Sequence, residues 1–454
     1  MDTNSKLNNW EDPHYVHPWH DFKKEANHFA LASKGEGIYI YDQNGSRHID
    51  GPGGMWCVNL GYGRTEIADA ISEQAKRLPY CSPWYYSNEP AANLAKKIAE
   101  RTPGDLNNVF FTTCGSTAID SALRFVQFYF NFLDQPQKKT VIARDKGYHG
   151  STYFAASISG KERDKRKLDT LSENVSFLSD VNPNLRDTNE TESQWCDKKV
   201  AELEGKILEL GAENVAAFVA EPILASGGVV IPPKGYHKRT KTICEKYEVL
   251  YISDEVVTGF GRLGHWFASE EVFDIIPDII TCAKGLTSGY IPMGATIISN
   301  KLMQNLQNTN YEEIIFSNGF TYSGHPVSAA AGLKVIEIME RENTLQHVQS
   351  ITPLFQERLK AIETKFSIVK EARGIGLLGC LEGNIGTATT EESKLKKDYD
   401  FGSLIDKAAE KRGLIIRPII NMCVFSPPLT ITKEEINILF DILEESLKEV
   451  ENTI

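Results

Sequence analysis

Six short apolar runs, separated by helix-length stretches, constrain the fold more than any other feature of this 454-residue chain. The runs lie at 108–113, 140–144, 215–222, 249–255, 278–285 and 294–299. They are almost continuously apolar, and helical patterns such as residues 121–133 and 235–249 lie between most of them. Alternating buried strands and helices predict a mostly parallel sheet that is covered by helices on both faces.

The regions on either side of these runs follow other patterns. Two apolar runs flank Asn44-Gly45, which predicts a β-hairpin. Beyond about residue 335 the pattern predicts helix, strand and helix, with strands within 367–383 and an amphipathic helix at the C-terminus. We expect the charged stretch 385–400 to be a surface loop. The predicted division is a large domain over residues 60–334 and a small domain over 335–454, to which the N-terminal segment 1–59 contributes.

Composition excludes several classes of partner. The formal net charge of −12 argues against nucleic acid or an anionic membrane as the main partner, because both favour a basic surface. The eight cysteines form no CxxC pair, and no His, Cys and Asp cluster has the spacing of a metal site. No apolar run approaches the roughly 18 residues of a membrane span. The first 30 residues lack the apolar segment of a secretory signal, so we expect a cytoplasmic location.

Three polar residues end successive apolar runs. They are Glu221, Asp254 and Lys284, separated by 33 residues (254 − 221) and 30 residues (284 − 254). Each gap is long enough for one crossover between parallel strands, and ligands bind at the carboxyl ends of such strands, so we expect one shared cleft. A lysine amine can form a Schiff base with an aldehyde, while a carboxylate can keep a pyridine nitrogen protonated. The spacing alone equally allows a buried salt bridge between Asp254 and Lys284.

A second signal follows the first apolar run. The run leads into Gly115-Ser116, and a helical pattern begins there at once. The free backbone N–H groups of a helix start and a serine hydroxyl can bind phosphate, although an ordinary helix cap has the same appearance. Tyr148 is expected at the same sheet edge, where its ring can stack on a planar ligand or simply join the core.

Two stretches together carry a family resemblance. DEVVTGFGRLG (254–264) and PDIITCAKGLTSGYIPMGA (277–295) resemble the signature of class III pyridoxal-phosphate-dependent aminotransferases. The similarity covers nearly the whole chain, including WCVNLGYG (56–63), YHGST (148–152), NGFTYSGHP (318–326) and GLIIRPI (413–419). It implies the aspartate-aminotransferase-like fold type I of these α/β enzymes. Such a fold has a large domain with a mainly parallel central sheet and a small α+β domain, and the implied cofactor is pyridoxal 5'-phosphate.

The resemblance also implies a role for each matching residue. Lys284 is expected to hold the cofactor and to move the substrate proton, and Asp254 to pair with the ring nitrogen. Val256 and Tyr148 are expected to cover the two faces of the ring. The remaining matches are implied to bind phosphate (Gly115, Ser116 and Thr321 of the neighbouring subunit) or substrate (Trp56, Tyr85, Tyr148, Glu221 and Arg417). The chain departs from many members at Thr117, where they have Glu.

The implied activity is ping-pong amino transfer from an ω-amino acid or amine donor to a 2-oxo acid such as pyruvate. A homodimer or tetramer with shared active sites is expected, and β-alanine, taurine, putrescine and aryl-alkyl amines remain open as donors. Arg417 is expected to be a mobile arginine that grips a carboxylate, the alternative being a fixed structural ion pair. A related aminomutase or decarboxylase would need no stoichiometric oxo acid. A non-catalytic binding or scaffold protein is disfavoured because Lys284 and Asp254 are both present.

Overall fold

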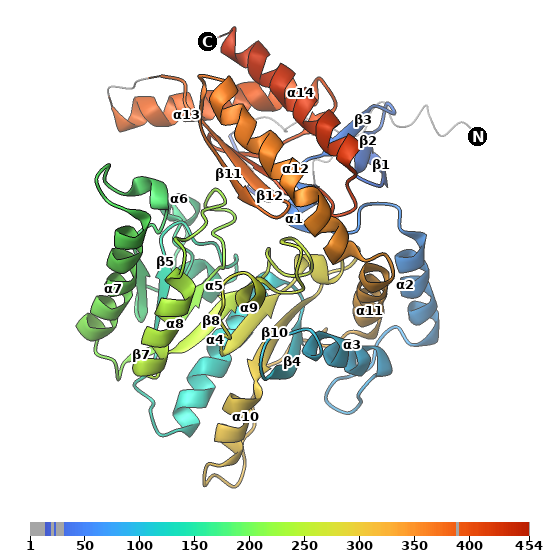
Figure 1. Ribbon diagram of the computed structural model, residues 1–454. Coiled ribbons are helices and arrows are strands. Elements are labelled where there is room, and N and C mark those ends of the chain that lie inside the picture. The colour runs from blue at the N-terminus through green and yellow to red at the C-terminus, as the bar shows by residue number, and fades with distance from the viewer. Residues whose placement is uncertain (1–13, 20–21, 24–30, 387–389, 454) are drawn as a thin grey trace.

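The computed structural model describes residues 14–19, 22–23, 31–386 and 390–453 (Figure 1). The prediction for the N-terminal segment 1–59 therefore falls partly outside the described residues. Three sheets organise the described chain, one of seven strands and two of four strands.

The seven-stranded sheet has the order β4-β10-β9-β8-β7-β5-β6. Its strands are β4 (Leu106–Thr112), β5 (Thr140–Arg144), β6 (Val175–Leu178), β7 (Val215–Ala220), β8 (Leu250–Asp254), β9 (Ile279–Cys282) and β10 (Gly294–Ser299). Strands β5 to β9 pair in parallel, and β10 is antiparallel to both of its neighbours. All six predicted runs are strands of this sheet. The edge strand β6 was missed because it is short and only partly buried, so it lacks a continuous apolar signal.

Helices cover both faces of this sheet because alternate strand residues point to opposite sides. Ala217 and Val219 of β7 belong to a core with α4 (Gly115–Phe132) and α10 (Asn300–Gln307), whereas Phe218 packs with residues of α7 (Glu192–Leu210) and α8 (Tyr236–Lys246). Near β10 and β4, a further core includes residues of α3 (Glu89–Ala99) and α11 (Pro326–Arg341). The layered arrangement is visible in Figure 1 and confirms the predicted mainly parallel, helix-covered sheet.

Residues 32–50 and 414–415, which are far apart in the sequence, meet in a second sheet, ordered β1-β2-β3-β13. Its strands are β1 (Ala32–Glu36), β2 (Tyr39–Asp42), β3 (Arg47–Asp50) and β13 (Leu414–Ile415). Strands β2 and β3 are antiparallel, which confirms the hairpin predicted at Asn44-Gly45, and β13 joins β3 in parallel. This pairing fixes the position of residues that follow β13 relative to those that follow β3.

The third sheet, β11-β12-β15-β14, completes the small α+β part of the fold. It contains β11 (Val369–Ile375), β12 (Leu378–Gly383), β14 (Pro418–Ile419) and β15 (Met422–Phe425), and it shares a core with α12 (Thr344–Lys365), α13 (Glu391–Glu410) and α14 (Lys433–Glu451). The strands predicted within 367–383 and the C-terminal helix are confirmed. The domain boundaries at residues 60 and 335 remain proposals.

The loop predicted at 385–400 is wrong for most of its length. Helix α13 begins at Glu391, and Thr390 and Ser393 form a capping box at its start. The first half of α13 is charged and largely exposed, and its buried face begins with Phe401 and Ile405. The apolar period that identifies the helix therefore lies beyond the stretch from which the loop was predicted. Residues 387–389 lie outside the described part of the chain.

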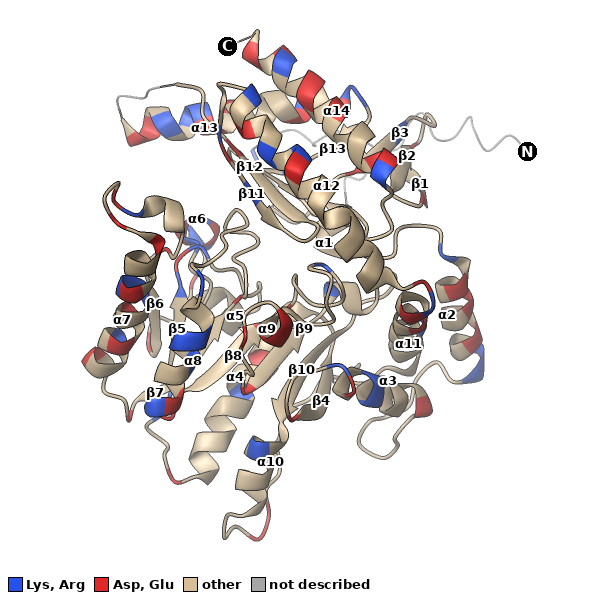
Figure 2. Ribbon diagram, in the orientation of Figure 1, with Lys and Arg blue, Asp and Glu red and all other residues tan. Residues whose placement is uncertain are grey.

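The remaining helices are short or lie outside the sheets. They are α1 (Gly53–Trp56), α2 (Thr65–Arg77), α5 (Tyr153–Ser157), α6 (Glu162–Lys165) and α9 (Ala268–Glu271), with 3₁₀ turns η2 (Pro183–Leu185) and η3 (Lys284–Leu286). Figure 2 shows Lys and Arg interspersed with Asp and Glu on outer helices such as α7, α12 and α14. Within the described ranges, no helix is long and apolar enough to cross a membrane.

Candidate active site

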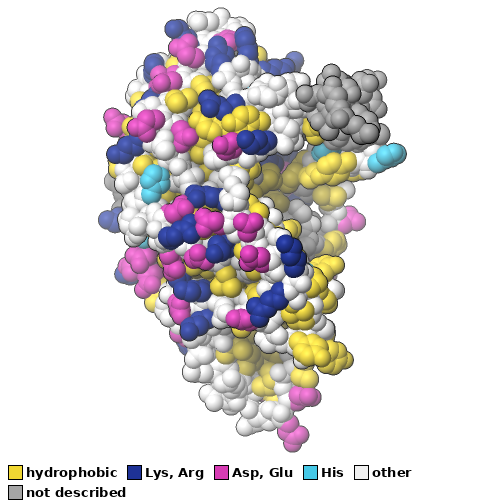
Figure 3. All heavy atoms as spheres, turned by 90° about the vertical axis from the view of Figure 1, so that its right-hand side faces the viewer, with side chains coloured by type: hydrophobic (Ala, Val, Ile, Leu, Met, Phe, Trp, Pro, Cys, Tyr) yellow, Lys and Arg dark blue, Asp and Glu magenta, His cyan; other side chains and the backbone are white. Residues whose placement is uncertain are grey.

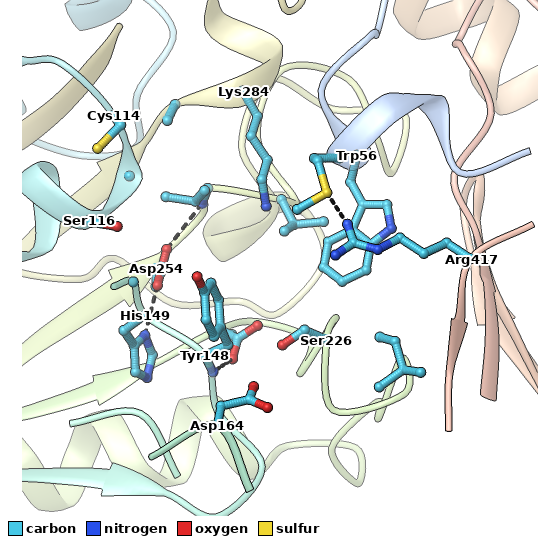
Figure 4. A pocket seen from close by; sticks show the side chains of 18 of the residues that line it. Trp56, Cys114, Ser116, Tyr148, His149, Asp164, Ser226, Asp254, Lys284 and Arg417 are labelled. Atoms are coloured by element: carbon cyan, nitrogen blue, oxygen red, sulfur yellow. Dashed lines mark hydrogen bonds and ion pairs between the residues drawn. The ribbon is translucent and has the colours of Figure 1, made fainter. Parts of the chain in front are cut away.

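A cavity of about 830 Å³ lies at the carboxyl ends of three adjacent parallel strands. Glu221 follows β7, Asp254 ends β8, and Lys284 lies two residues after β9, and all three line this cavity. The structure therefore brings together the three strand-end residues that the sequence singled out. Figure 4 shows the Lys284 side chain reaching into the cavity above Asp254 and Tyr148.

Lys284 starts the turn η3 with a φ of 44°, in the left-handed region that non-glycine residues rarely adopt. Its Nζ lies 5.0 Å from the centre of the Trp56 ring. Burial lowers the pKa of the Lys284 amine, although the Asp254 carboxylate acts in the opposite direction. The lowered pKa increases the fraction of neutral amine, which is the nucleophilic form.

Asp254 is almost fully buried. Residues other than Lys284 hold its carboxylate in place. His149 Nδ1 lies 2.7 Å from Oδ2, while Thr281 Oγ1 and the backbone N–H of Val256 donate to Oδ1, each at 3.2 Å. Among the described residues, no ion pair joins Asp254 to Lys284, so the salt-bridge alternative is not what the structure shows. The Asp254 carboxylate is instead oriented toward the cavity by a fixed set of donors (Figure 4).

Glu221 ties two segments of the cavity wall together. Its Oε1 accepts the backbone N–H of Tyr148 at 3.0 Å, and its Oε2 accepts that of Ala225 at 3.1 Å. Burial raises the pKa of this carboxyl, with the nearby His149 opposing the shift. In this structure Glu221 therefore acts on the shape of the cavity through the segments at residues 148 and 225.

The start of helix α4 forms another wall of the cavity. Gly115 and Ser116 line it, and the first N–H groups of a helix have no acceptor within the helix, which makes this a suitable anion site. A Cβ at Gly115 would lie 3.0 Å from a methyl group of Val256, so a side chain at Gly115 would be in tight contact with Val256. Thr117 Oγ1 accepts the backbone N–H of Cys114 at 3.0 Å, so the departure at Thr117 serves as a helix cap.

Arg417 lies on the opposite side, between β13 and β14, and is half-buried. Its guanidinium contacts the sulfur of Met55 and lies 5.5 Å from the centre of the Trp19 ring. Burial lowers the pKa of Arg417. In the described part of the chain no carboxylate forms an ion pair with Arg417. The structure therefore gives no support there to the alternative of a fixed structural ion pair. Trp56 and Arg417 line the same cavity (Figure 4).

Two predicted site residues lie outside this cavity. Tyr85 is 85% exposed and Thr321 is exposed, and neither lines the cavity of the single chain. Their segments are neighbours, because Asn88 Nδ2 donates to the backbone oxygen of Gly324 at 2.9 Å. The roles of Tyr85 in substrate binding and of Thr321 in a neighbouring site stay predictions.

Several residues in or beside the cavity were not found from the sequence. His149 follows Tyr148 and Met55 precedes Trp56, but no sequence pattern distinguishes either side chain from an ordinary core residue. Thr281 points to Asp254 from the neighbouring strand, a relation that only strand pairing creates. Lys161 and Ser226 also line the cavity, although neither ends an apolar run.

Comparisons with known proteins give one consistent result. Residues 22–447 match the family described as aminotransferase class III. The chain is 38% identical over 451 residues to the putrescine–pyruvate aminotransferase of Pseudomonas aeruginosa, covering 98% of this chain and 97% of that protein. It is 36% identical over 431 residues to the mitochondrial gamma-aminobutyrate transaminase 1 of Oryza sativa subsp. indica, covering 94% of this chain and 83% of that protein.

Solved structures agree with these sequence matches. The omega transaminase of Pseudomonas jessenii in complex with PMP superposes with a TM-score of 0.91 at 30% identity, covering 97% of each chain. An (S)-enantioselective omega-transaminase from Thermomicrobium roseum gives a TM-score of 0.90 at 32% identity, covering 96% of each chain. These likenesses confirm the predicted fold class.

Proposed function

The chain belongs to the class III aminotransferase family, and we propose that it transfers an amino group from an ω-amino acid or amine donor to pyruvate by a ping-pong mechanism. The cavity is the main support for this proposal, because a buried lysine, a buried carboxylate and a separate arginine all line it. The lysine and the carboxylate suit amine chemistry, and the arginine suits the carboxylate of an oxo acid. The name of the Pseudomonas aeruginosa relative supports pyruvate as the acceptor.

Enzymes of this family depend on pyridoxal 5'-phosphate. The cavity fits that group, because a helix start suited to a phosphate and a buried carboxylate suited to a ring nitrogen both line it. We assign the phosphate to the N–H groups at the start of α4, with Gly115 and Ser116, and the ring nitrogen to Asp254. Val256 and Tyr148 also line the cavity and are assigned to the ring faces. When bound, the cofactor accepts the electrons left behind as the substrate carbon loses its proton.

The residues of the chain supply the remaining steps. Because burial lowers the pKa of Lys284, its neutral amine can take a proton from the substrate carbon and return it. His149 and Thr281 keep the Asp254 carboxylate in place, so that its negative charge favours a protonated ring nitrogen. Arg417 can donate two parallel hydrogen bonds to the carboxylate of an oxo acid, and we propose that it moves aside for a donor that lacks one.

The dependence on oxo acid tests this function directly. Purified holoenzyme is incubated with one amine donor at a time, with and without pyruvate, and the products are counted per active site. A transaminase stops after about one turnover without pyruvate and continues when it is added. Sustained turnover without an oxo acid would indicate an aminomutase or a decarboxylase instead. If no donor changes the absorbance of the bound cofactor, the non-catalytic alternative is correct.

We further propose a homodimer whose active sites contain residues of both subunits. An aromatic patch of Tyr80, Trp84, Tyr85, Tyr86 and Tyr322 is exposed on the chain, at 40% to 85% of each residue's surface. Tyr80 and Tyr322 lie 6.3 Å apart, so the segments that hold Tyr85 and Thr321 belong to one surface. Figure 3 shows hydrophobic side chains gathered along one edge of the molecule. Exposed apolar area of this kind indicates a protein interface.

Sedimentation and activity measured over the same dilution series test the dimer. We expect an obligate interface above about 2,000 Å² and loss of activity wherever the dimer dissociates. A monomer that keeps full activity would contradict shared active sites.

The cytoplasmic location also stays a proposal, supported by eight cysteines that are all free thiols in the structure.

A further inference from the structure

The turn η3 fixes where the Lys284 side chain starts, and a buried asparagine packs directly against this turn. Lys284 has a φ of 44°, so the turn depends on its surroundings to keep an uncommon backbone conformation. The next residue, Gly285, has no positive φ, yet a Cβ there would collide with Asn59 Nδ2 and lie 2.9 Å from Phe260 Cβ. Close contact with these two residues, rather than backbone conformation, therefore requires glycine at position 285.

The residue after Asn59 holds the same turn at a second point. The backbone N–H of Leu60 donates to Ser288 Oγ at 2.8 Å. Asn59, Leu60 and Ser288 are all almost fully buried, so water does not compete for these contacts. Two adjacent residues from the loop between α1 and α2 therefore contact the turn, one next to Lys284 and one just beyond η3.

The Asn59 side chain is itself held at both of its polar atoms. Its Nδ2 donates to the backbone oxygen of Phe260 at 2.7 Å, and its Oδ1 accepts a hydrogen bond from Arg262 Nη2 at 3.1 Å. The backbone oxygen of Asn59 also accepts the N–H of Leu429 at 2.7 Å. The side chain therefore cannot rotate without leaving a polar group unpaired in the core, which costs free energy.

Arg262 is completely buried, and the three oxygens to which it donates are all uncharged. Besides Asn59 Oδ1, they are the backbone oxygens of Leu377 at 3.1 Å and Pro427 at 2.6 Å. Leu377 lies between β11 and β12, and Pro427 follows β15. In the described ranges no carboxylate forms an ion pair with Arg262. A planar guanidinium has donors in fixed directions, so Arg262 holds the small sheet and Asn59 in one geometry.

We propose that Asn59 and Arg262 are positioning residues for Lys284, a proposal that rests on the role of Lys284 proposed above. Apolar side chains could fill the space of Arg262 and Asn59 without burying a charge, so their hydrogen bonds add geometry rather than packing. Arg262 fixes Asn59, and Asn59 fixes the turn that holds Lys284. A displaced turn would move the Lys284 amine away from the substrate carbon, which slows proton transfer without weakening the binding of the amine donor.

Asn59→Ala and Arg262→Met test the proposal in the holoenzyme, with putrescine as the amine donor. In Asn59→Ala we expect the single-turnover rate to fall by about 10- to 100-fold, while the apparent dissociation constant of putrescine changes by less than about threefold. The pH at which the absorbance of the bound cofactor changes should shift, because it reports the surroundings of the Lys284 nitrogen. Arg262→Met should show the same pattern with smaller changes, and Arg262→Lys, which restores a donor, should recover part of it.

Gln356→Ala is the matched control. Gln356 Nε2 donates to the backbone oxygens of Gly376 at 2.8 Å and Leu378 at 3.3 Å, so it supports the same connection between β11 and β12 from the side of α12. This variant should lower the unfolding temperature and leave the rate and the pH midpoint as in the wild type. If Asn59→Ala also changes only the unfolding temperature, Asn59 and Arg262 are structural and the proposal is wrong.

Gly285→Ala changes the same contact from the side of the turn, so it tests the proposal even if Asn59→Ala is unstable. The added methyl group should displace the turn and produce the slower rate and the shifted pH midpoint. In the double variant Asn59→Ala/Gly285→Ala the methyl group meets only Phe260, so the combined loss of rate should be smaller than the product of the two separate losses. A combined loss equal to that product would overturn the contact.

The pH titration needs no donor, so it separates this proposal from the proposed function. If Asn59→Ala shifts the pH midpoint as expected but the wild type transfers no amino group to pyruvate, the proposed function fails and the positioning role survives. If the wild type is an active transaminase and the midpoint and rate of Asn59→Ala are unchanged, only the positioning role fails.

Discussion

The two ends of the cavity differ in how completely their polar groups are satisfied. At the cofactor end, the carboxylates of Asp254 and Glu221 each accept at least two hydrogen bonds from the chain. At the substrate end, Trp56 Nε1 and Ser226 Oγ have no partner among the described residues. The Arg417 guanidinium there contacts a sulfur and lies near an aromatic ring, and no carboxylate of the described residues forms an ion pair with it.

This difference separates chemistry from recognition. A preorganised charge at the cofactor end needs no rearrangement during the reaction, which is where electrostatic catalysis is most effective. Unsatisfied groups at the substrate end can exchange their weak contacts for ligand contacts at little cost. We therefore expect substitutions at the cofactor end to affect every substrate, and those at the substrate end to affect only some.

The largest effect is expected from Lys284→Ala. Without its amine, the variant should lose the yellow absorbance of the bound cofactor, and multiple-turnover transamination should fall by roughly 10⁴-fold or more. Absorbance spectroscopy and steady-state kinetics measure the two losses. Lys301→Ala, which changes an exposed lysine, should behave as the wild type does. Wild-type turnover in Lys284→Ala would remove the lysine from the mechanism.

Asp254→Asn should have the next largest effect, because it keeps the shape of the side chain and removes its charge. We expect the single-turnover rate with any amine donor to fall by about 10²- to 10³-fold. The exposed Asp274→Asn is the control. An unchanged rate of proton loss from the substrate carbon would show that the ring nitrogen does not depend on this carboxylate.

Arg417→Ala should separate the two half-reactions. The half-reaction with pyruvate should weaken by about 1.5–3 kcal/mol, the scale of a lost charge-assisted contact, and the half-reaction with a simple amine should change little. Single-turnover titration of each half-reaction provides the comparison. Arg412→Ala removes a nearby arginine that pairs with Glu449 and should alter neither. Equal damage to both half-reactions, with a lower unfolding temperature, would indicate a structural role for Arg417.

The smallest effect is expected from His149→Ala. This histidine positions the Asp254 carboxylate, so its removal should slow the amine half-reaction by about tenfold, near the value of one hydrogen bond. The pH at which the cofactor absorbance changes should shift as well. His149→Gln, which restores a donor, should recover part of both effects. A change in thermal stability with no shift in that pH profile would show that His149 only contributes to packing in the core.

The sequence alone predicted the parts of the site that follow from strand ends. Glu221, Asp254 and Lys284 were identifiable because each interrupts or ends an apolar run, and parallel strands carry such residues to one edge of the sheet. The start of α4 was identifiable in the same way. The family resemblance extended the predictions to Trp56 and Arg417, which line the cavity.

Only the tertiary structure decided which side chains complete the cavity between these points. His149, Lys161 and Ser226 come from irregular segments, whose paths depend on packing against distant strands rather than on a local period. Their chemistry depends equally on that packing, since Ser226 is unsatisfied and Lys161 has a lowered pKa only because other segments exclude water from them. A period in the sequence identifies an element and its buried face, but burial of a single polar group is a property of the assembled fold.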